Sequence, residues 1–160
     1  MSYLVATALA DRYKIDLDSD RVLKMAIFHD VGEAATGEIA TAVKDLLPAE
    51  TLRETEHRLL SALLKGLPAA DEVEKLVREY DAGDTNSALI VKFADVLDAV
   101  GHAKDRLHTS FPEYLERRAA WFRAKAEAGS PTAGILSRWL TELIDEWPGR
   151  RRPWAPSGAR

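Results

Sequence analysis

The sequence predicts an all-α fold, in the form of a single compact bundle of about six to eight helices. Apolar residues recur three and four positions apart, first in the run that ends at Leu67 and again between Leu89 and Val100. The strict alternation of apolar and polar residues that indicates a half-buried strand is absent. Glycines also stand at several positions where helices would end.

These glycines divide the chain into its expected elements. Gly66, Gly83 and Gly129 each suit the left-handed position that closes a helix, and each is soon followed by a residue that begins the next one. In chain order, we expect helices over residues 2–14, 20–30, 48–65, 69–82, 85–107, 112–128 and 131–147, with a shorter one near 40–46.

Length, charge and composition narrow the class of protein. The chain has 160 residues, enough for one domain with a real core, and no cysteine for disulfides or thiolate chemistry. Its net charge of −4 argues against binding nucleic acid through a basic face. The first residues lack the basic leader and small-residue cleavage site expected of a signal peptide, and no apolar run reaches the roughly 18–20 residues of a membrane span. We therefore expect a cytoplasmic protein with no nucleic-acid or membrane partner.

The last residues differ in composition from the rest. Residues 148–160 hold four arginines, three prolines and no acidic residue. Such a segment is expected to be a disordered, solvated tail, so the folded domain is expected to cover residues 1–147. The alternative is an arm that docks on an acidic partner or on a second subunit.

The helix expected over residues 20–30 ends in polar residues that fall on apolar sectors. At 100° per residue, Leu23, Ile27 and Asp30 share one stripe, and Met25 and His29 share the adjoining one. An ionised carboxylate in an apolar place is costly unless it is paired or binds a metal. The residues therefore point to a metal site, and the alternative is an ordinary hydrogen-bonded core histidine.

Two more carboxylates follow this helix. Glu33 and Glu38 lie in a glycine-punctuated stretch just beyond its end. A loop or short turn there would bring these acids back toward His29 and Asp30.

Another carboxylate that could belong to the site lies about 60 residues further on, in the helix expected over residues 85–107. Asp95 falls off the apolar stripe of that helix, between Ala88 and Ala99, whose small side chains let another helix approach closely. The alternative is a solvated carboxylate on the flank of an amphipathic helix.

Taken in order, these residues form a recognisable pattern: an apolar helix ending in His-Asp, then x-x-Glu, x-x-Thr-Gly-acid, and later Lys-x-Ala-Asp. The pattern resembles the HD-domain phosphohydrolase superfamily, and within it the 5′-deoxynucleotidase branch. The resemblance covers roughly residues 1–110 and rests on His29, Asp30, Glu33, Thr36-Gly37-Glu38, Val43-Lys44 and Val91-Lys92-Phe93-Ala94-Asp95.

The resemblance implies a metal site. In that family two histidines and two aspartates bind one divalent ion, and His29, Asp30 and Asp95 match three of the four ligands. Imidazole and carboxylate together suit Mn²⁺, Co²⁺, Mg²⁺ or Fe²⁺, with Zn²⁺ less favoured.

The resemblance also implies an activity: a metal-activated water releases phosphate from (deoxy)nucleoside 5′-monophosphates. Glu33 and Glu38 are then the catalytic carboxylates, with Glu33 donating a proton to the leaving group or orienting the water. Lys44 would contact the substrate phosphate, although a solvated cation is the alternative. A homodimer is also implied. The other histidines are assigned no role; they are His57, His102 and His108.

The sequence departs from the family at its start. The position of the remaining histidine ligand, about 28 residues before His29, is Met1, and the family's Arg-Trp pair ahead of that histidine is absent. Either the chain as given begins too late, so that its N-terminus is truncated relative to the family, or this form has an impaired site.

An impaired site leads to a second hypothesis, an HD-fold protein without catalysis that serves as a binding or assembly module. In that case Trp121, Trp139 and Trp147 would line a subunit contact, whereas their ordinary role is core packing. A third hypothesis keeps the metal and changes the substrate to a cyclic nucleotide or a guanosine polyphosphate.

Overall fold

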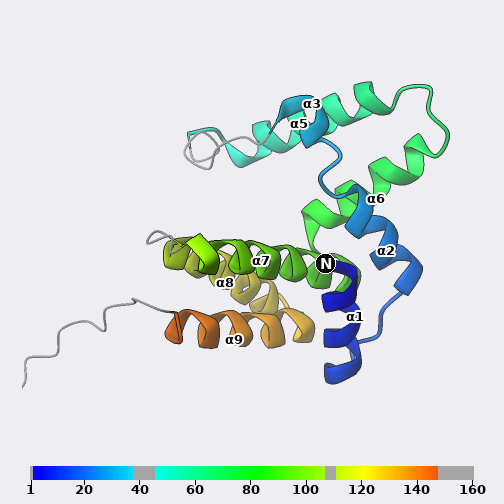
Figure 1. Cartoon of the computed structure of the whole chain (residues 1–160). Helices are drawn as coiled ribbons and strands as arrows, with labels where there is room; N and C mark the ends of the chain where they lie inside the picture. The colour runs from blue at the N-terminus through cyan, green and yellow to red at the C-terminus, as the bar shows by residue number, and fades with distance from the viewer. Residues whose placement is uncertain (1, 38–45, 107–110, 148–160) are drawn as a thin grey trace, which may run out of the picture. The chain divides into compact units, whose positions relative to one another are not determined.

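The computed structural model describes residues 2–37, 46–106 and 111–147, and within these ranges every regular element is a helix (Figure 1). The all-α prediction is confirmed. In chain order the helices are α1 (Ser2–Tyr13), α2 (Ser19–Phe28), α3 (Glu33–Thr36), α5 (Ala49–Leu64), α6 (Ala70–Ala82), α7 (Asn86–Arg106), α8 (Phe111–Glu127) and α9 (Pro131–Asp145).

The predicted boundaries agree with these helices to within two residues, with one addition. The stretch that begins at Glu33, expected as a loop or short turn, forms the four-residue helix α3. The helix expected near 40–46 and the tail of residues 148–160 lie outside the described residues. Among the described helices, none is both long and apolar enough to cross a lipid bilayer.

The chain divides into two compact units, Met1–Ala94 and Asp95–Arg160. Helix α7 runs without a break through the boundary between them.

In the first unit, α2 and α5 both pack against α6 (Figure 1). Their shared hydrophobic cluster consists of Leu60, Leu64, Val73 and Val77. Phe28 and Val31, the residues on either side of His29-Asp30, pack against this cluster. The cluster therefore anchors the backbone turn that carries the predicted metal ligands.

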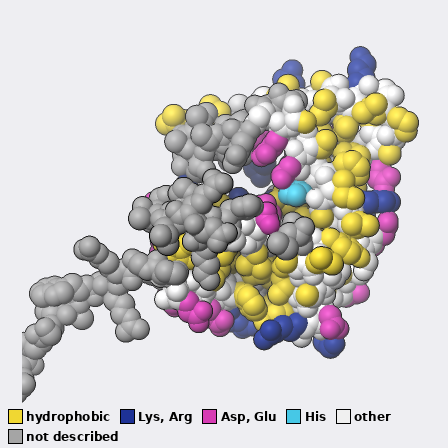
Figure 2. All heavy atoms as spheres, in the orientation of Figure 1, with side chains coloured by type: hydrophobic (Ala, Val, Ile, Leu, Met, Phe, Trp, Pro, Cys, Tyr) yellow, Lys and Arg dark blue, Asp and Glu magenta, His cyan; other side chains and the backbone are white. Residues whose placement is uncertain are grey.

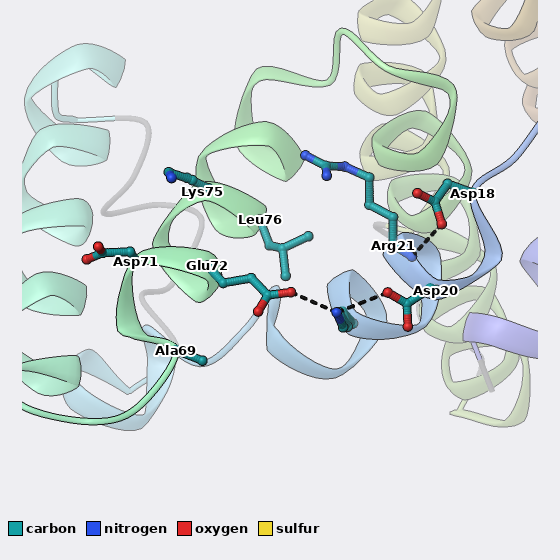
Figure 3. A pocket seen from close by; sticks show the side chains of 9 residues that line it. Asp18, Asp20, Arg21, Ala69, Asp71, Glu72, Lys75 and Leu76 are labelled. Atoms are coloured by element: carbon teal, nitrogen blue, oxygen red, sulfur yellow. Dashed lines mark hydrogen bonds and ion pairs between the residues drawn. The ribbon is translucent and has the colours of Figure 1, made fainter.

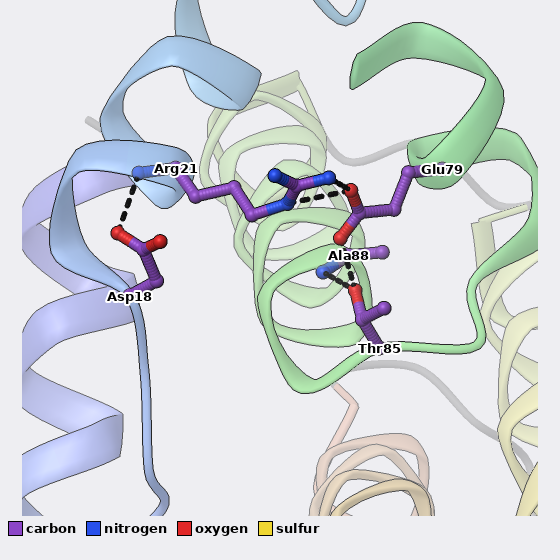
Figure 4. A network of polar contacts seen from close by, with 5 residues as sticks. All are labelled: Asp18, Arg21, Glu79, Thr85 and Ala88. Carbon is purple, nitrogen blue, oxygen red and sulfur yellow. Dashed lines mark hydrogen bonds and ion pairs between the residues drawn. The ribbon is translucent and has the colours of Figure 1, made fainter. Parts of the chain in front are cut away.

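A polar network holds α2 against α6 and the start of α7 (Figure 4). Asp18 caps α2 by accepting a hydrogen bond from the Arg21 backbone N–H at 3.0 Å. The Arg21 guanidinium donates through Nε to Glu79 Oε2 at 2.6 Å and pairs with the same oxygen through Nη2. Thr85 Oγ1 donates to Glu79 Oε1 at 2.6 Å and accepts from the Ala88 N–H. Both carboxylate oxygens of Glu79 are thereby satisfied.

The hydrogen bonds to Glu79 change its acidity. Burial by itself raises the pKa of this carboxyl, but hydrogen bonds from Arg21 and Thr85 and the charge of Arg21 outweigh it, so the pKa is lowered overall. The ionised form is therefore the one that the fold favours.

A hollow of about 420 Å³ lies beside this network, between α2 and the first turns of α6 (Figure 3). Lys24 joins its two sides, with Nζ 2.8 Å from Glu72 Oε1 and 3.0 Å from Asp20 Oδ2. Ion pairing across the hollow links the same two helices, so we interpret it as part of the packing of α2 on α6.

In the second unit, α8 and α9 form an antiparallel pair (Figure 1). Gly129 has a φ of +105°, which suits glycine, and Ser130 caps α9 by accepting from the Ala133 N–H at 3.2 Å. Trp147 is 8% exposed and packs in the interior, whereas Trp121 and Trp139 are partly exposed. Core packing, the ordinary role, therefore holds for Trp147.

Candidate metal centre

His29 is the first residue beyond α2, and two hydrogen bonds fix its position. Its backbone N–H donates to the Met25 carbonyl at 2.9 Å, closing the last turn of the helix. Its ring nitrogen Nδ1 lies 3.1 Å from the Ala26 carbonyl oxygen. A carbonyl only accepts, so Nδ1 carries a proton, and in the neutral imidazole Nε2 then presents the lone pair. Metal-binding histidines are commonly oriented in this way, by donation of the other ring N–H to a backbone carbonyl.

The lone pair of His29 faces a carboxylate. Nε2 lies 3.0 Å from Asp30 Oδ2, and the angles of this contact are not those of a hydrogen bond. The imidazole side chain is only 10% exposed. The lone pair of a neutral imidazole and a carboxylate oxygen repel each other at this separation unless a metal ion or a proton lies between them. The chemistry of this pair therefore fits a bound metal ion.

The predicted burial of Asp30 was wrong. Val22 and Met25 are fully buried on the side of α2 that leads to His29, but Leu23 and Ile27 are 41% and 63% exposed. Asp30 shares their stripe, and its side chain is 59% exposed. Figure 2 shows hydrophobic side chains at the surface on the side where Figure 1 has α2 and α6. An exposed carboxylate loses little hydration and leaves an ion accessible to substrate.

Asp95 completes the candidate ligand set. It directly follows Ala94 in the uninterrupted helix α7, and its side chain is half-buried. One ligand atom from each of His29, Asp30 and Asp95 lies within 4.8 Å of the others. Two ligands on opposite sides of one ion, each about 2.1 Å from it, are separated by about 4.2 Å. Small side-chain adjustments would therefore let the three groups share one ion. Among the residues that the structure describes, this is the one cluster of histidine and acidic side chains close enough to hold a metal ion.

Tyr80 lies against the imidazole, and Lys92 lies over the Tyr80 ring. In the sequence, Lys92 was noted only as part of the Lys-x-Ala-Asp motif, with no role of its own, and Tyr80 was not noted. The Tyr80 ring of α6 lies 4.9 Å from the His29 ring, centroid to centroid, with the planes tilted by 52°. The Lys92 ammonium lies 3.7 Å from the centroid of the Tyr80 ring, a cation–π contact. The available signal was the position of Lys92 one helical turn before Asp95.

Of the two predicted catalytic carboxylates, the structure describes Glu33 but not Glu38. Glu33 begins α3 with an exposed side chain, and its backbone N–H donates to the Asp30 carbonyl at 2.9 Å. The stretch is thus the helix α3, and the approach of the Glu33 carboxylate to His29 and Asp30 stays a prediction. Glu38 and Lys44 lie outside the described residues, as does Met1.

His57, to which the sequence assigned no role, takes part in a partly buried polar contact. Its side chain is 16% exposed, and Nε2 lies 2.7 Å from Asp81 Oδ2. Arg78 Nη1 donates to Nδ1 at 3.0 Å, so Nε2 carries the proton and donates to Asp81. This group connects α5 with α6. The side chains of His102 and His108 lie outside the described set.

Comparison with known proteins agrees with this architecture. A family model described as "HD domain" matches residues 1–129. A 5′-deoxynucleotidase of Erwinia tasmaniensis is 30% identical over 138 residues, which are 79% of this chain and 68% of that protein. The 5′-deoxynucleotidase HDDC2 of Mus musculus is 29% identical over 91 residues, 56% of this chain and 45% of that protein. The HDDC2 protein of Dictyostelium discoideum is 27% identical over 105 residues, 64% and 53% respectively. No solved structure matches the chain.

The described residues form an all-α fold in which a His-Asp pair and a later aspartate come close enough together to hold one metal ion. The chain belongs to the HD-domain family, in its 5′-deoxynucleotidase-like branch. It spans about two thirds of the Erwinia protein and about half of the two HDDC2 proteins.

Proposed function

We propose that this chain is a metal-dependent hydrolase that releases inorganic phosphate from deoxynucleoside 5′-monophosphates. The observation that carries the proposal is the convergence of His29, Asp30 and Asp95, with the His29 lone pair facing a carboxylate. The names of the similar proteins supply the substrate class.

The ligand atoms that would hold the ion are His29 Nε2 and one oxygen each from Asp30 and Asp95. When bound, a divalent ion supplies a Lewis acid for the phosphoryl oxygen and a water activated for attack on phosphorus. One imidazole and two carboxylates suit Mn²⁺, Co²⁺, Mg²⁺ or Fe²⁺. The Ala26 carbonyl keeps the imidazole in the tautomer that this role requires.

Glu33 is the proposed proton donor to the leaving alkoxide, or the group that orients the attacking water. Its place in the first turn of α3, joined through its backbone to Asp30, supports this role. Glu38 as a second catalytic carboxylate and Lys44 as a phosphate contact remain proposals from the sequence alone.

The first experiment compares two aspartates of α7. Phosphate release from dAMP is measured with Mn²⁺ or Co²⁺ for the wild type, Asp95→Asn and Asp98→Asn. We expect Asp95→Asn to lower kcat at least about 100-fold, because an amide replaces an anionic ligand. Asp98→Asn removes a charge one turn away in the same helix and should retain activity. Full activity in Asp95→Asn would mean that the metal site is elsewhere.

The substrate class needs a separate test. dAMP, AMP, a cyclic nucleotide and a guanosine polyphosphate are compared by kcat/KM under one set of conditions. We expect the deoxynucleoside monophosphate to be hydrolysed best. A wild type that binds metal but hydrolyses none of the four would favour the binding-module hypothesis.

Two further properties accompany this proposal: a homodimer in solution, which the family resemblance implies, and a cytoplasmic location, which is expected from the composition and the N-terminal sequence. Light scattering coupled to size-exclusion chromatography measures the first; a mass near 17.7 kDa would contradict a dimer.

A further inference from the structure

A lysine ammonium lies close to the candidate ligands. Lys92 Nζ is 3.7 Å from the Tyr80 ring centroid, and that centroid is 4.9 Å from the centroid of the His29 ring. The sum of these two distances is the largest separation that the ammonium and the imidazole can have. Lys92 also lies one turn before Asp95 on α7, so both residues project from the same side of that helix.

A cation in this place does not help a metal ion to bind. A positive charge near a divalent ion repels it, and the repulsion weakens slowly with distance at a partly buried position. The Lys92 side chain is only partly exposed, and the aromatic ring holds its head. The carboxylates of Asp30 and Asp95 offset part of this repulsion, and an anion that contacts both the ion and the ammonium offsets more of it. A phosphate that bears two negative charges is such an anion.

The dimensions agree with a bridging phosphate. An oxygen bound to a metal lies about 2 Å from it, and a charged hydrogen bond from an ammonium to a second oxygen is about 2.8 Å long. A phosphate group that makes both contacts separates the metal from the ammonium by several ångströms. The two ring distances allow a separation of this size between the Lys92 ammonium and the His29 imidazole.

We propose that Lys92 binds the phosphate of the substrate, and that Tyr80 is a positioning residue that holds the Lys92 ammonium beside the His29 imidazole. The inference rests on the proposed function and deepens it by naming the cation that recognises the phosphate. Lysine suits this task because its ammonium is a compact charge with three donors.

The experiment separates phosphate binding from metal binding. Co²⁺ affinity is measured by visible absorption, and inorganic phosphate is then tested as a competitive inhibitor of dAMP hydrolysis. In Lys92→Met we expect Co²⁺ to bind as tightly as in the wild type or more tightly. The inhibition constant for phosphate and the KM for dAMP should rise about 10- to 100-fold, since a charged hydrogen bond is lost. Lys92→Arg should restore part of this loss.

The matched control is Lys125→Met in α8. Lys125 also lies over an aromatic ring, with Nζ 5.5 Å from the centroid of Trp121. The Lys125→Met substitution removes the same charge from the chain as Lys92→Met does. We expect its phosphate inhibition constant to equal that of the wild type. For the positioning role, Tyr80→Phe should keep wild-type phosphate binding, and Tyr80→Leu should weaken it several-fold.

The wild type provides a test that does not depend on how a variant folds. Reductive methylation of lysines is followed by mass spectrometry, with and without phosphate in the presence of Co²⁺. We expect phosphate to slow the modification of Lys92 and to leave Lys125 unchanged. An active wild type with no protection of Lys92, or an active Lys92→Met with unchanged phosphate inhibition, would overturn this inference alone. A wild type that neither hydrolyses dAMP nor binds phosphate would overturn the proposed function as well.

Discussion

Two histidine–aspartate contacts in the first unit use the same residue types in opposite ways. At the end of α2, His29 Nδ1 donates to a backbone carbonyl, so the Nε2 lone pair meets Asp30 at 3.0 Å. Between α5 and α6, His57 Nδ1 accepts from Arg78, so the Nε2 proton meets Asp81 at 2.7 Å. In the neutral form of each ring, the partner of Nδ1 decides which contact is a completed hydrogen bond and which one is open to a metal ion.

Helix α6 contributes to both contacts through consecutive residues. Glu79 pairs with Arg21, Tyr80 contacts the His29 ring, and Asp81 accepts from His57. One turn of α6 therefore holds α2 and α5 and also supports the candidate metal ligand.

The largest expected effect tests the comparison directly. His29→Gln should weaken Co²⁺ binding at least about 100-fold and abolish hydrolysis, since loss of an outer partner alone typically costs 10- to 100-fold. His57→Gln should leave Co²⁺ affinity within about twofold. Calorimetric titration of both variants measures this difference. Equal metal binding by His29→Gln and the wild type would show that the two histidines do not differ in the way we infer.

Metal binding should also stabilise the folded protein. At a Co²⁺ concentration 100 times Kd, linkage adds about 2.7 kcal/mol, which corresponds to a Tm increase of about 5–10 °C for a chain of this length. Differential scanning fluorimetry with and without EDTA measures the shift. We expect the shift in His57→Gln and not in His29→Gln; the same shift in both would place the ion away from α2.

The sequence predicted the helices more completely than the site. Glycines and apolar spacing located the helix ends because both act locally along the chain. The motif named the three residues of the candidate ligand set, but the exposure of Asp30 depends on which side of α2 packs against its neighbours. The contact of Tyr80 with His29 likewise requires the packing of α2 on α6, which no local pattern encodes.

The Arg21–Glu79 pair should make stability depend on pH in a defined direction. The pKa of Glu79 is lowered in the folded protein, so the pair stabilises the fold above the ordinary pKa near 4.5 and loses this effect as pH falls through the folded value. We expect Glu79→Gln to lower the unfolding free energy by about 1 kcal/mol at pH 7 and by less at pH 3. Urea unfolding at both pH values measures it. A constant difference between the two pH values would show that Glu79 acts through packing instead of charge.

The smallest expected effect comes from one substitution made at both contacts. Asp81→Asn keeps an oxygen that accepts the His57 Nε2 proton, so we expect it to change the unfolding free energy by less than about 1 kcal/mol. Asp30→Asn also leaves the fold stable, but it replaces an anionic ligand and should weaken Co²⁺ binding about tenfold. Urea unfolding gives the unfolding free energy of each variant, and Co²⁺ titration gives its metal affinity. If Asp81→Asn lowered metal affinity as much as Asp30→Asn, the two contacts would be coupled through α6, and His57 would have to be counted among the residues that position the site.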